Sequence, residues 1–131
     1  MMWLLDTNAL ILCKKLKEKL FQKGKTFTTI LSIIEFPPAF KFKDISVIYP
    51  TNSHYEHAFS KAVLLRENGI PIPTIDILIG TISIEKNLTL VSDDSHFEYL
   101  KNVDKRLAII SSQDYINGIL SPPRDNDQSP K

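Results

Sequence analysis

Four acidic residues interrupt or end apolar segments of this 131-residue sequence. The segments are Leu-Leu-Asp-Thr-Asn, Ser-Ile-Ile-Glu-Phe, Thr-Ile-Asp-Ile-Leu and Ser-Asp-Asp-Ser, and the acids are Asp6, Glu35, Asp76 and Asp94. Converging carboxylates repel one another and are poorly solvated unless a cation lies among them, and hard cations such as Mg²⁺ and Mn²⁺ prefer oxygen ligands. If the fold brings the four acids together, they predict a divalent-metal site.

Each acid also has a structural role open to it. Asp6 follows an apolar run and Asp94 precedes a helical segment, so both suit helix caps, and Asp76 in a first helical turn suits the helix dipole. Glu35 lies between apolar neighbours and needs a partner if it is buried. The joint occurrence of the four, in this order, favours the metal site over four separate structural roles.

The elements that must position these acids alternate between short apolar strands and helices. We expect strands at 2–5, 26–28, 45–49, 88–91 and 107–110. We expect helices from about 12 to Gly24, from Thr29 or Ser32 through Glu35 to a break at Pro37-Pro38, over 53–68, over 75–86, and from Asp94 or Ser95 to 99. The 53–68 helix has a capping box of Ser53 and Glu56 and one apolar stripe, formed by Tyr55, Ala58, Phe59, Ala62 and Val63.

This alternation predicts an α/β fold, a three-layer sandwich with a mostly parallel sheet of four to five strands flanked by helices. Sites in such sheets form at the carboxyl ends of strands, so Asp6 and the Asp93-Asp94 pair are expected at the same edge. Residues 1–120 are long enough for one domain. Residues 121–131 are polar and proline-rich, and we expect a disordered tail there.

Composition narrows the class of protein further. The 16 basic residues balance the 15 acidic ones, so any attraction to nucleic acid must come from local clusters. The single Cys13 excludes an intramolecular disulfide and is expected to be a buried small side chain in a reducing cytoplasm. We find no export signal and no apolar segment long enough for a membrane. The three histidines lack zinc spacing, and His96 is expected to pack against or cap the last helix.

The sequence resembles the PIN-domain family, and most closely its small bacterial and archaeal ribonuclease toxins, called VapC. The resemblance rests on Leu-Leu-Asp-Thr-Asn-Ala-Leu-Ile near the start, on Thr29, Ser32 and Glu35 at the spacing of the family's Ser-x-x-Thr-x-x-Glu, and on the run from Asp76 to Phe97. Two features depart from the family pattern. Phe36-Pro37-Pro38 follows the glutamate where many relatives have a glycine, and Gly80-Thr81 follows the third acid where many have Ala-Ala.

The resemblance implies a PIN-like fold and a metal-dependent endoribonuclease that uses one or two Mg²⁺ or Mn²⁺ ions. Asp6, Glu35 and Asp76 match the three acidic positions directly, and Asp94 matches the fourth, with Asp93 as its rival. The remaining matches are hydroxyl and amide positions that orient the carboxylates or the metal-bound water in relatives, and here they are Thr7, Asn8 and Ser92. Helix capping is the alternative role of these three residues.

The resemblance also implies three partners: RNA as substrate, a cognate antitoxin that blocks the site, and a second copy of the chain in a homodimer. Lys14, Lys15 and Lys17 are candidates for RNA phosphate contacts, although lysines on an amphipathic helix also serve simply as a solvated face. Two other functions stay open. One is a housekeeping nuclease that processes RNA precursors without an antitoxin, and the other is a non-catalytic PIN module that binds RNA or supports assembly.

Overall fold

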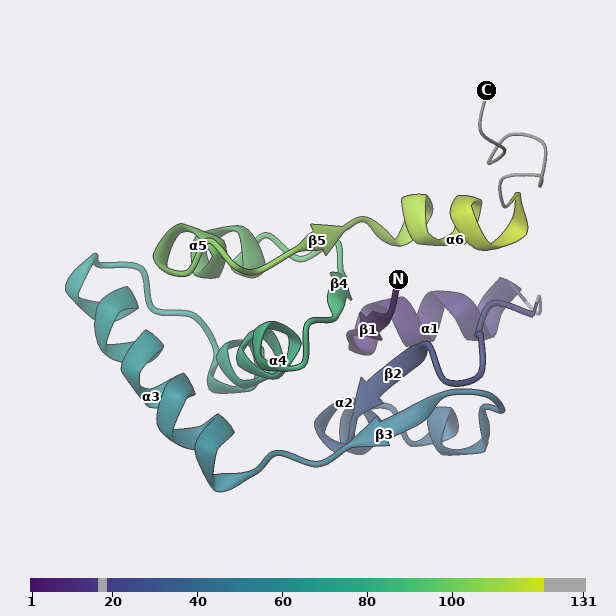
Figure 1. The fold of residues 1–131 in the computed structure, drawn as a ribbon, viewed down its shortest axis with the longest axis horizontal. Coiled ribbons are helices and arrows are strands. Elements are labelled where there is room, and N and C mark those ends of the chain that lie inside the picture. The colour runs from purple at the N-terminus through teal and green to yellow at the C-terminus, as the bar shows by residue number, and fades with distance from the viewer. Residues whose placement is uncertain (17–18, 122–131) are drawn as a thin grey trace.

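The computed structural model describes residues 1–16 and 19–121. Within them the chain forms five strands, six α-helices and one 3₁₀ helix (Figure 1). In chain order the elements are β1 (Trp3–Leu5), α1 (Thr7–Leu16), β2 (Thr26–Thr29), α2 (Ile30–Glu35), η1 (Pro37–Lys41), β3 (Ser46–Ile48), α3 (Asn52–Glu67), α4 (Thr74–Glu85), β4 (Thr89–Val91), α5 (His96–Val103), β5 (Ile109–Ile110) and α6 (Ser112–Leu120). Except for Ser121, the predicted disordered tail lies outside the described residues, and so does Lys17.

The five strands form one parallel sheet in the order β3-β2-β1-β4-β5. The chain builds one half of the sheet outward from β1 through β2 to β3, and the other half from β4 to β5. The strand order therefore reverses between β1 and β4, where Leu4 lies opposite Leu90 and Leu5 opposite Val91. The crevice outside the carboxyl ends of such a strand pair is the usual ligand site of an open α/β sheet.

Side chains of the two central strands alternate between two apolar cores. Leu4 and Leu90 point into one core, which α3, α4 and α5 cover. Leu5 and Val91 point into the other core, which α1, α2 and α6 cover. The sheet is therefore the middle layer of a three-layer sandwich, as the sequence predicts, and continuous apolar runs suit strands that are buried on both faces. Figure 1 shows α3, α4 and α5 gathered at one side of the sheet.

The first helix is shorter than predicted, because it ends at Leu16 in the described chain and does not run to Gly24. Leu20 is buried in the α1-side core from a non-helical segment. Gly24 has a φ of +79° and forms the turn into β2, where the Lys25 amide donates to the Gln22 carbonyl oxygen. Leu20, which has the spacing expected of a helical residue, does pack into the core, but from the segment that follows the helix.

The start of α3 also differs from the prediction. The cap is Thr51, whose hydroxyl accepts from the His54 amide, and the His54 ring accepts from the Thr51 amide in return. This reciprocal pair replaces the predicted capping box of Ser53 and Glu56, because the cap lies two residues earlier than predicted. Thr29, one of the two predicted starts of the second helix, caps α2 with its side chain. The helix predicted over 75–86 begins one residue earlier, at Thr74, and has no side-chain cap.

The predicted apolar stripe of α3 is largely in solvent. Phe59 is 70% exposed, Tyr55 54% and Val63 41%, while Ala58 and Ala62 are half-buried against the core. The helix packs instead through His54, Lys61 and Leu65, which are buried. Helical spacing identified an apolar face of α3 but could not say whether the core or another surface covers it.

Helix α6 was not predicted. Its signals are present in the sequence, because Ser111 caps it through a hydrogen bond from the Asp114 amide, and Tyr115, Ile116 and Ile119 follow at helical spacing. Tyr115 is buried, and its hydroxyl donates to the Leu20 carbonyl oxygen. Cys13 is 6% exposed, which confirms the buried side chain predicted there, and this burial raises the pKa of its thiol to about 11. Among the described residues no helix is long and apolar enough to cross a bilayer.

Candidate metal centre

A pocket of about 500 Å³ opens at the carboxyl edge of β1 and β4, where the strand order reverses. The start of α1, the end of α2, the start of α4 and the loop from β4 to α5 contribute to it. Its lining contains all four predicted acids and consists of Asp6, Thr7, Asn8, Glu35, Pro73, Thr74, Ile75, Asp76, Ile79, Asp94 and His96. The fold therefore brings together acids that lie up to 88 positions apart in the sequence.

Asp6 is the most deeply placed of the four acids, with 6% of its surface exposed. One carboxylate oxygen accepts from the Ala9 amide at 2.9 Å and the other accepts from the Ser92 hydroxyl. Burial raises the pKa of Asp6 to about 6; these two hydrogen bonds oppose the rise, and the charges of Asp94 and Asp76 add to it. The site thus holds a desolvated carboxylate beside two other acids, an arrangement that a cation would relieve.

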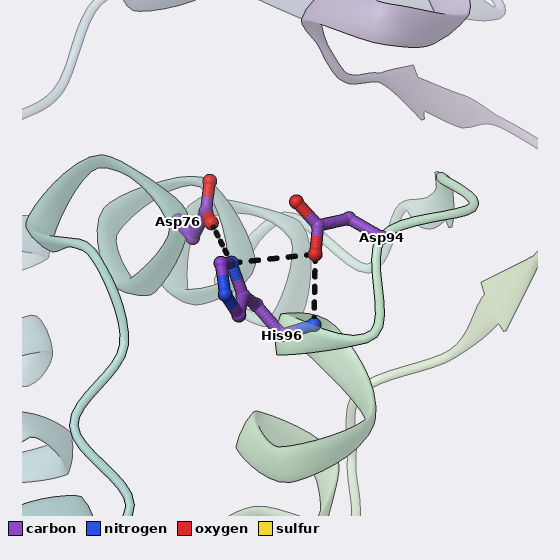
Figure 2. Close-up of side chains that lie close together, drawn as sticks. All are labelled: Asp76, Asp94 and His96. Atoms are coloured by element: carbon purple, nitrogen blue, oxygen red, sulfur yellow. Dashed lines mark hydrogen bonds and ion pairs between the residues drawn. The ribbon is translucent and has the colours of Figure 1, made fainter.

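Asp76, Asp94 and His96 form a compact group (Figure 2). All three line the same pocket as Asp6. The His96 Nδ1 atom lies 2.8 Å from Asp76 Oδ2 and 3.3 Å from Asp94 Oδ1. Burial raises the pKa of Asp76; the hydrogen bond with His96 opposes this, and the charges of Asp94 and Glu35 reinforce it. Each of the three residues offers a ligand atom within 4.8 Å of those of the other two.

Asp94 belongs to this acidic group and also caps the start of α5, the structural role that the sequence predicted for it. Its Oδ1 atom accepts from the His96 amide at 2.9 Å, and its own amide donates to the Ser92 hydroxyl oxygen at 3.0 Å. Ser92 therefore connects the two strand ends, because it donates to Asp6 and accepts from Asp94. This link fixes the β4–α5 loop against the end of β1.

Glu35, the last residue of α2, also lines the pocket. Its carboxylate accepts from the Thr7 hydroxyl at 2.7 Å. The helix ends there because Pro37 and Pro38 begin η1, as predicted for this proline pair. Thr7 and Ser92, two of the residues expected to orient carboxylates, thus each donate to one, whereas Asn8 lines the pocket without a side-chain hydrogen bond to any other described residue.

The structure separates Asp93 from the four acids. Its carboxylate accepts from the Ser112 amide at 2.9 Å and from the Ser112 hydroxyl, at the start of α6. The two neighbouring aspartates therefore point to different elements, Asp94 into the acidic pocket and Asp93 toward α6. Lys14 and Lys15 are exposed in the last turn of α1, outside the pocket lining, and Lys17 is not described.

Sequence reasoning did not place His96 at this site. The missing information is the contact between α4 and the start of α5, which sets the His96 ring against Asp76 on α4. A usable signal was its position two residues after Asp94, at a strand end already expected to carry the site. Two carboxylates and an imidazole, those of Asp76, Asp94 and His96, form a donor set that could hold a divalent metal, and the Asp6 and Glu35 carboxylates line the same pocket. Carboxylate oxygens suit Mg²⁺ or Mn²⁺, and the imidazole also suits softer divalent metals.

One departure from the family pattern also has a structural explanation. Gly80 lies in α4, and a Cβ atom there would meet Leu100 of α5 at 2.1 Å. The glycine therefore lets α5 approach α4 closely. Because α4 carries Asp76 and α5 carries His96, this close approach helps to bring these two residues together.

Comparison with known structures identifies the architecture. The chain superimposes on a chain of VapBC2 from Rickettsia felis, solved bound to a DNA fragment from its promoter, with a TM-score of 0.67 and 18% identity over 85% of this chain and 98% of that one. The fold is PIN-like. A chain of VapBC-1 from nontypeable Haemophilus influenzae gives the same TM-score at 19% identity, over 86% and 99% of the two chains. The PIN-like fold predicted from the motifs is confirmed, although the sequence matches no family model and no curated protein.

Proposed function

We propose that this chain is a divalent-metal-dependent endoribonuclease and the toxin of a toxin–antitoxin pair. The observation that carries the proposal is the convergence of Asp6, Glu35, Asp76 and Asp94 in one pocket at the strand-order reversal. The pKa shifts of Asp6 and Asp76 support it, because perturbed acids in a cleft are typical of functional sites. The likeness to chains of VapBC complexes supports the toxin role.

The four carboxylates would hold one or two Mg²⁺ or Mn²⁺ ions, with His96 available as a nitrogen ligand. Bound ions of this kind supply a water nucleophile at neutral pH and stabilise the charge that develops on a phosphodiester during hydrolysis. The protein's own contribution is orientation. Thr7 fixes Glu35, while Ser92 and the Ala9 amide fix Asp6, so these carboxylates need not reorganise when a cation arrives.

The same acids make the proposed activity dependent on a bound metal. A pocket of carboxylates without a cation repels the phosphates of RNA, so the proposed activity must depend strictly on divalent metal. Asp94 is the fourth ligand in this proposal, and Asp93 anchors the start of α6. A cytoplasmic location, in keeping with a buried free thiol, stays a prediction.

The test is Mn²⁺ and Mg²⁺ binding by calorimetry on the wild type, Asp6→Asn and Asp76→Asn, with cleavage of structured RNAs measured in parallel. Asp114→Asn is the matched control, because it removes an exposed carboxylate in the first turn of α6, outside the pocket. We expect metal binding and cleavage to be lost in both site variants and kept in the control. A folded wild type that binds no divalent metal would overturn the metal-dependent activity and favour the non-catalytic module.

The biological role needs a separate experiment. We expect expression of the wild type in a bacterial host to arrest growth and Asp76→Asn to abolish the arrest. Co-expression with the product of a neighbouring small reading frame should restore growth if that product is the antitoxin. Metal-dependent cleavage without growth arrest would instead favour the housekeeping nuclease.

We assign the predicted homodimer contact to the exposed face of α3. Tyr55 and Phe59 border an apolar recess of about 260 Å³, whose other lining residues are Ala58, Ala62, Thr74, Ile77 and Leu78. A protruding ring beside an apolar recess is self-complementary, because a two-fold axis places each ring at the other copy's recess. Phe59→Ser should give a monomer by light scattering, and Phe40→Ser, which alters a ring that is 74% exposed on η1, should not. A wild type that is monomeric at high concentration would refute the assignment.

A further inference from the structure

A second polar pocket, of about 570 Å³, lies at the other end of α1 from the acidic site. Its lining comes from the end of α1, the segment before β2 and the end of η1 with the residues after it. We call it the lysine basin, and it is lined by Cys13, Lys14, Lys19, Leu20, Phe21, Lys41, Phe42, Lys43 and Asp44.

The charge of the lysine basin is strongly positive. Four exposed lysines and one aspartate line it, in a chain whose formal net charge is only +1. None of the four makes an ion pair or a side-chain hydrogen bond with another residue of the described chain. The helix dipole accounts for Lys14 and Lys41, which lie in the last turns of α1 and η1, but not for Lys19 and Lys43. The positive charge of the basin therefore exceeds what these elements need for their own stability.

Aromatic rings accompany the lysines. Phe21 and Phe42 pack with their ring centroids 5.3 Å apart at an interplanar angle of 31°, and both are half-buried against the α1-side core. Their partial burial fixes them in place while leaving part of each ring accessible. A basic surface combined with anchored aromatic rings is the composition of sites that bind single-stranded nucleic acid, where phosphates meet ammonium groups and bases stack on rings.

Two elements connect the basin to the acidic pocket. Helix α1 carries Thr7 in the pocket and Lys14 in the basin, about 10 Å apart along the axis at 1.5 Å per residue. The α2–η1 segment likewise carries Glu35 in the acidic pocket and Lys41 in the basin. The two pockets therefore share two elements, and a single strand bound in the basin needs to extend only about 10 Å along α1 to reach the acidic pocket.

We propose that the lysine basin binds the phosphate backbone of single-stranded RNA, next to the segment that enters the acidic pocket. This inference rests on the proposed ribonuclease function and adds the surface that holds its substrate. The acidic pocket itself repels phosphates, so affinity for RNA has to come from another part of the chain, and the basin supplies the opposite charge. The accessible rings favour unpaired bases over a duplex, whose bases are stacked inside.

Binding is measured with a labelled oligouridine of about 16 nucleotides, in EDTA so that no cleavage occurs. The test variant is Lys41→Gln/Lys43→Gln, and the matched control is Lys86→Gln/Lys105→Gln, which removes two exposed lysines outside the basin. We expect at least a tenfold loss of affinity in the test variant alone. The slope of log affinity against log salt should fall by about 1.4, because each single-strand phosphate contact contributes about 0.7. Phe42→Leu, which keeps an apolar side chain but removes the ring, should weaken binding without changing that slope.

The outcomes separate the inference from the proposed function. Equal loss in both lysine variants, or in neither, overturns the basin as the RNA site even when cleavage is intact. Loss confined to the basin variant supports the basin even when no metal-dependent cleavage is found. Polyglutamate that displaces RNA fully, combined with Phe42→Leu binding RNA as tightly as the wild type, would overturn RNA in favour of an acidic protein partner.

Discussion

Replacing Asp6 by asparagine should stabilise the metal-free protein at neutral pH, although it removes a proposed metal ligand. The physical reason is that the folded state disfavours the charged form of Asp6. Its pKa is raised from 3.8 to about 6, chiefly by burial. The stability due to protonated Asp6 is therefore fully present below pH 3.8 and is lost as the pH rises through about 6.

The size of the effect follows from this shift. One pKa unit corresponds to about 1.4 kcal/mol, so the wild type loses about 3 kcal/mol of unfolding free energy between pH 3.8 and neutral pH through this group. Asparagine does not titrate, and its amide oxygen can still accept from the Ala9 amide. The altered hydrogen bond to Ser92 costs about 1 kcal/mol at every pH. The net gain of Asp6→Asn should thus be about 2 kcal/mol at pH 7, and a small loss should appear at pH 4.

The assay is urea unfolding of wild type, Asp6→Asn and the control Asp114→Asn from pH 4 to 8, in EDTA and again with Mn²⁺. In EDTA the stability difference between Asp6→Asn and the wild type should grow by about 3 kcal/mol across this range. With Mn²⁺ the order should reverse, because only the wild type gains free energy from binding. A difference that does not change with pH would refute the assignment of Asp6 as a desolvated carboxylate.

Two further predictions concern the neighbouring aspartates and two glycines. Asp94→Asn should lower Mn²⁺ affinity at least tenfold in calorimetry. Asp93→Asn should leave Mn²⁺ affinity nearly unchanged and lower the free energy of unfolding by about 1 kcal/mol, because it weakens the contact with Ser112 at the start of α6. The opposite pattern would make Asp93 the ligand. Gly80→Ala should destabilise the protein by about 1 to 3 kcal/mol in urea unfolding, because its Cβ would overlap buried Leu100. Gly118→Ala, where a Cβ meets no atom within 4 Å, should instead be neutral or stabilising by up to about 1 kcal/mol, and equal effects at the two glycines would contradict the close approach of α5 to α4.

The order and type of most elements could be predicted from local patterns. Trp3–Leu5 is a continuous apolar run, and Leu90-Val91 is the apolar part of Thr89–Val91; short runs of this kind are typical of strands buried on both faces. Pro37 ends the helix after Glu35 because proline offers no amide to continue it. The first helix was predicted too long because Leu20 has the spacing of a helical residue but reaches the core from a non-helical segment.

The solvent side of α3 shows a limit of periodicity. Tyr55 and Phe59 repeat with helical spacing, and this spacing is the same whether a face meets the core, another molecule or water. The buried side of α3 includes Lys61, whose ammonium group pairs with Asp104 at 3.7 Å. A basic residue on the packed side and aromatic rings on the open side reverse the usual pattern.

The sequence by itself determined which residues are acidic, that Asp6 and Asp94 follow strands, and that parallel strands must end at one edge. These features follow from local sequence patterns, and they were enough to predict that Asp6 and Asp94 lie at the same edge of the sheet. Only the tertiary structure decided that His96 meets Asp76, that Asp93 turns away to Ser112, and that burial raises the pKa of Asp6. Each of these depends on contacts between α4, α5, α6 and the sheet, because the distance between side chains on different elements and their removal from water are properties of packing.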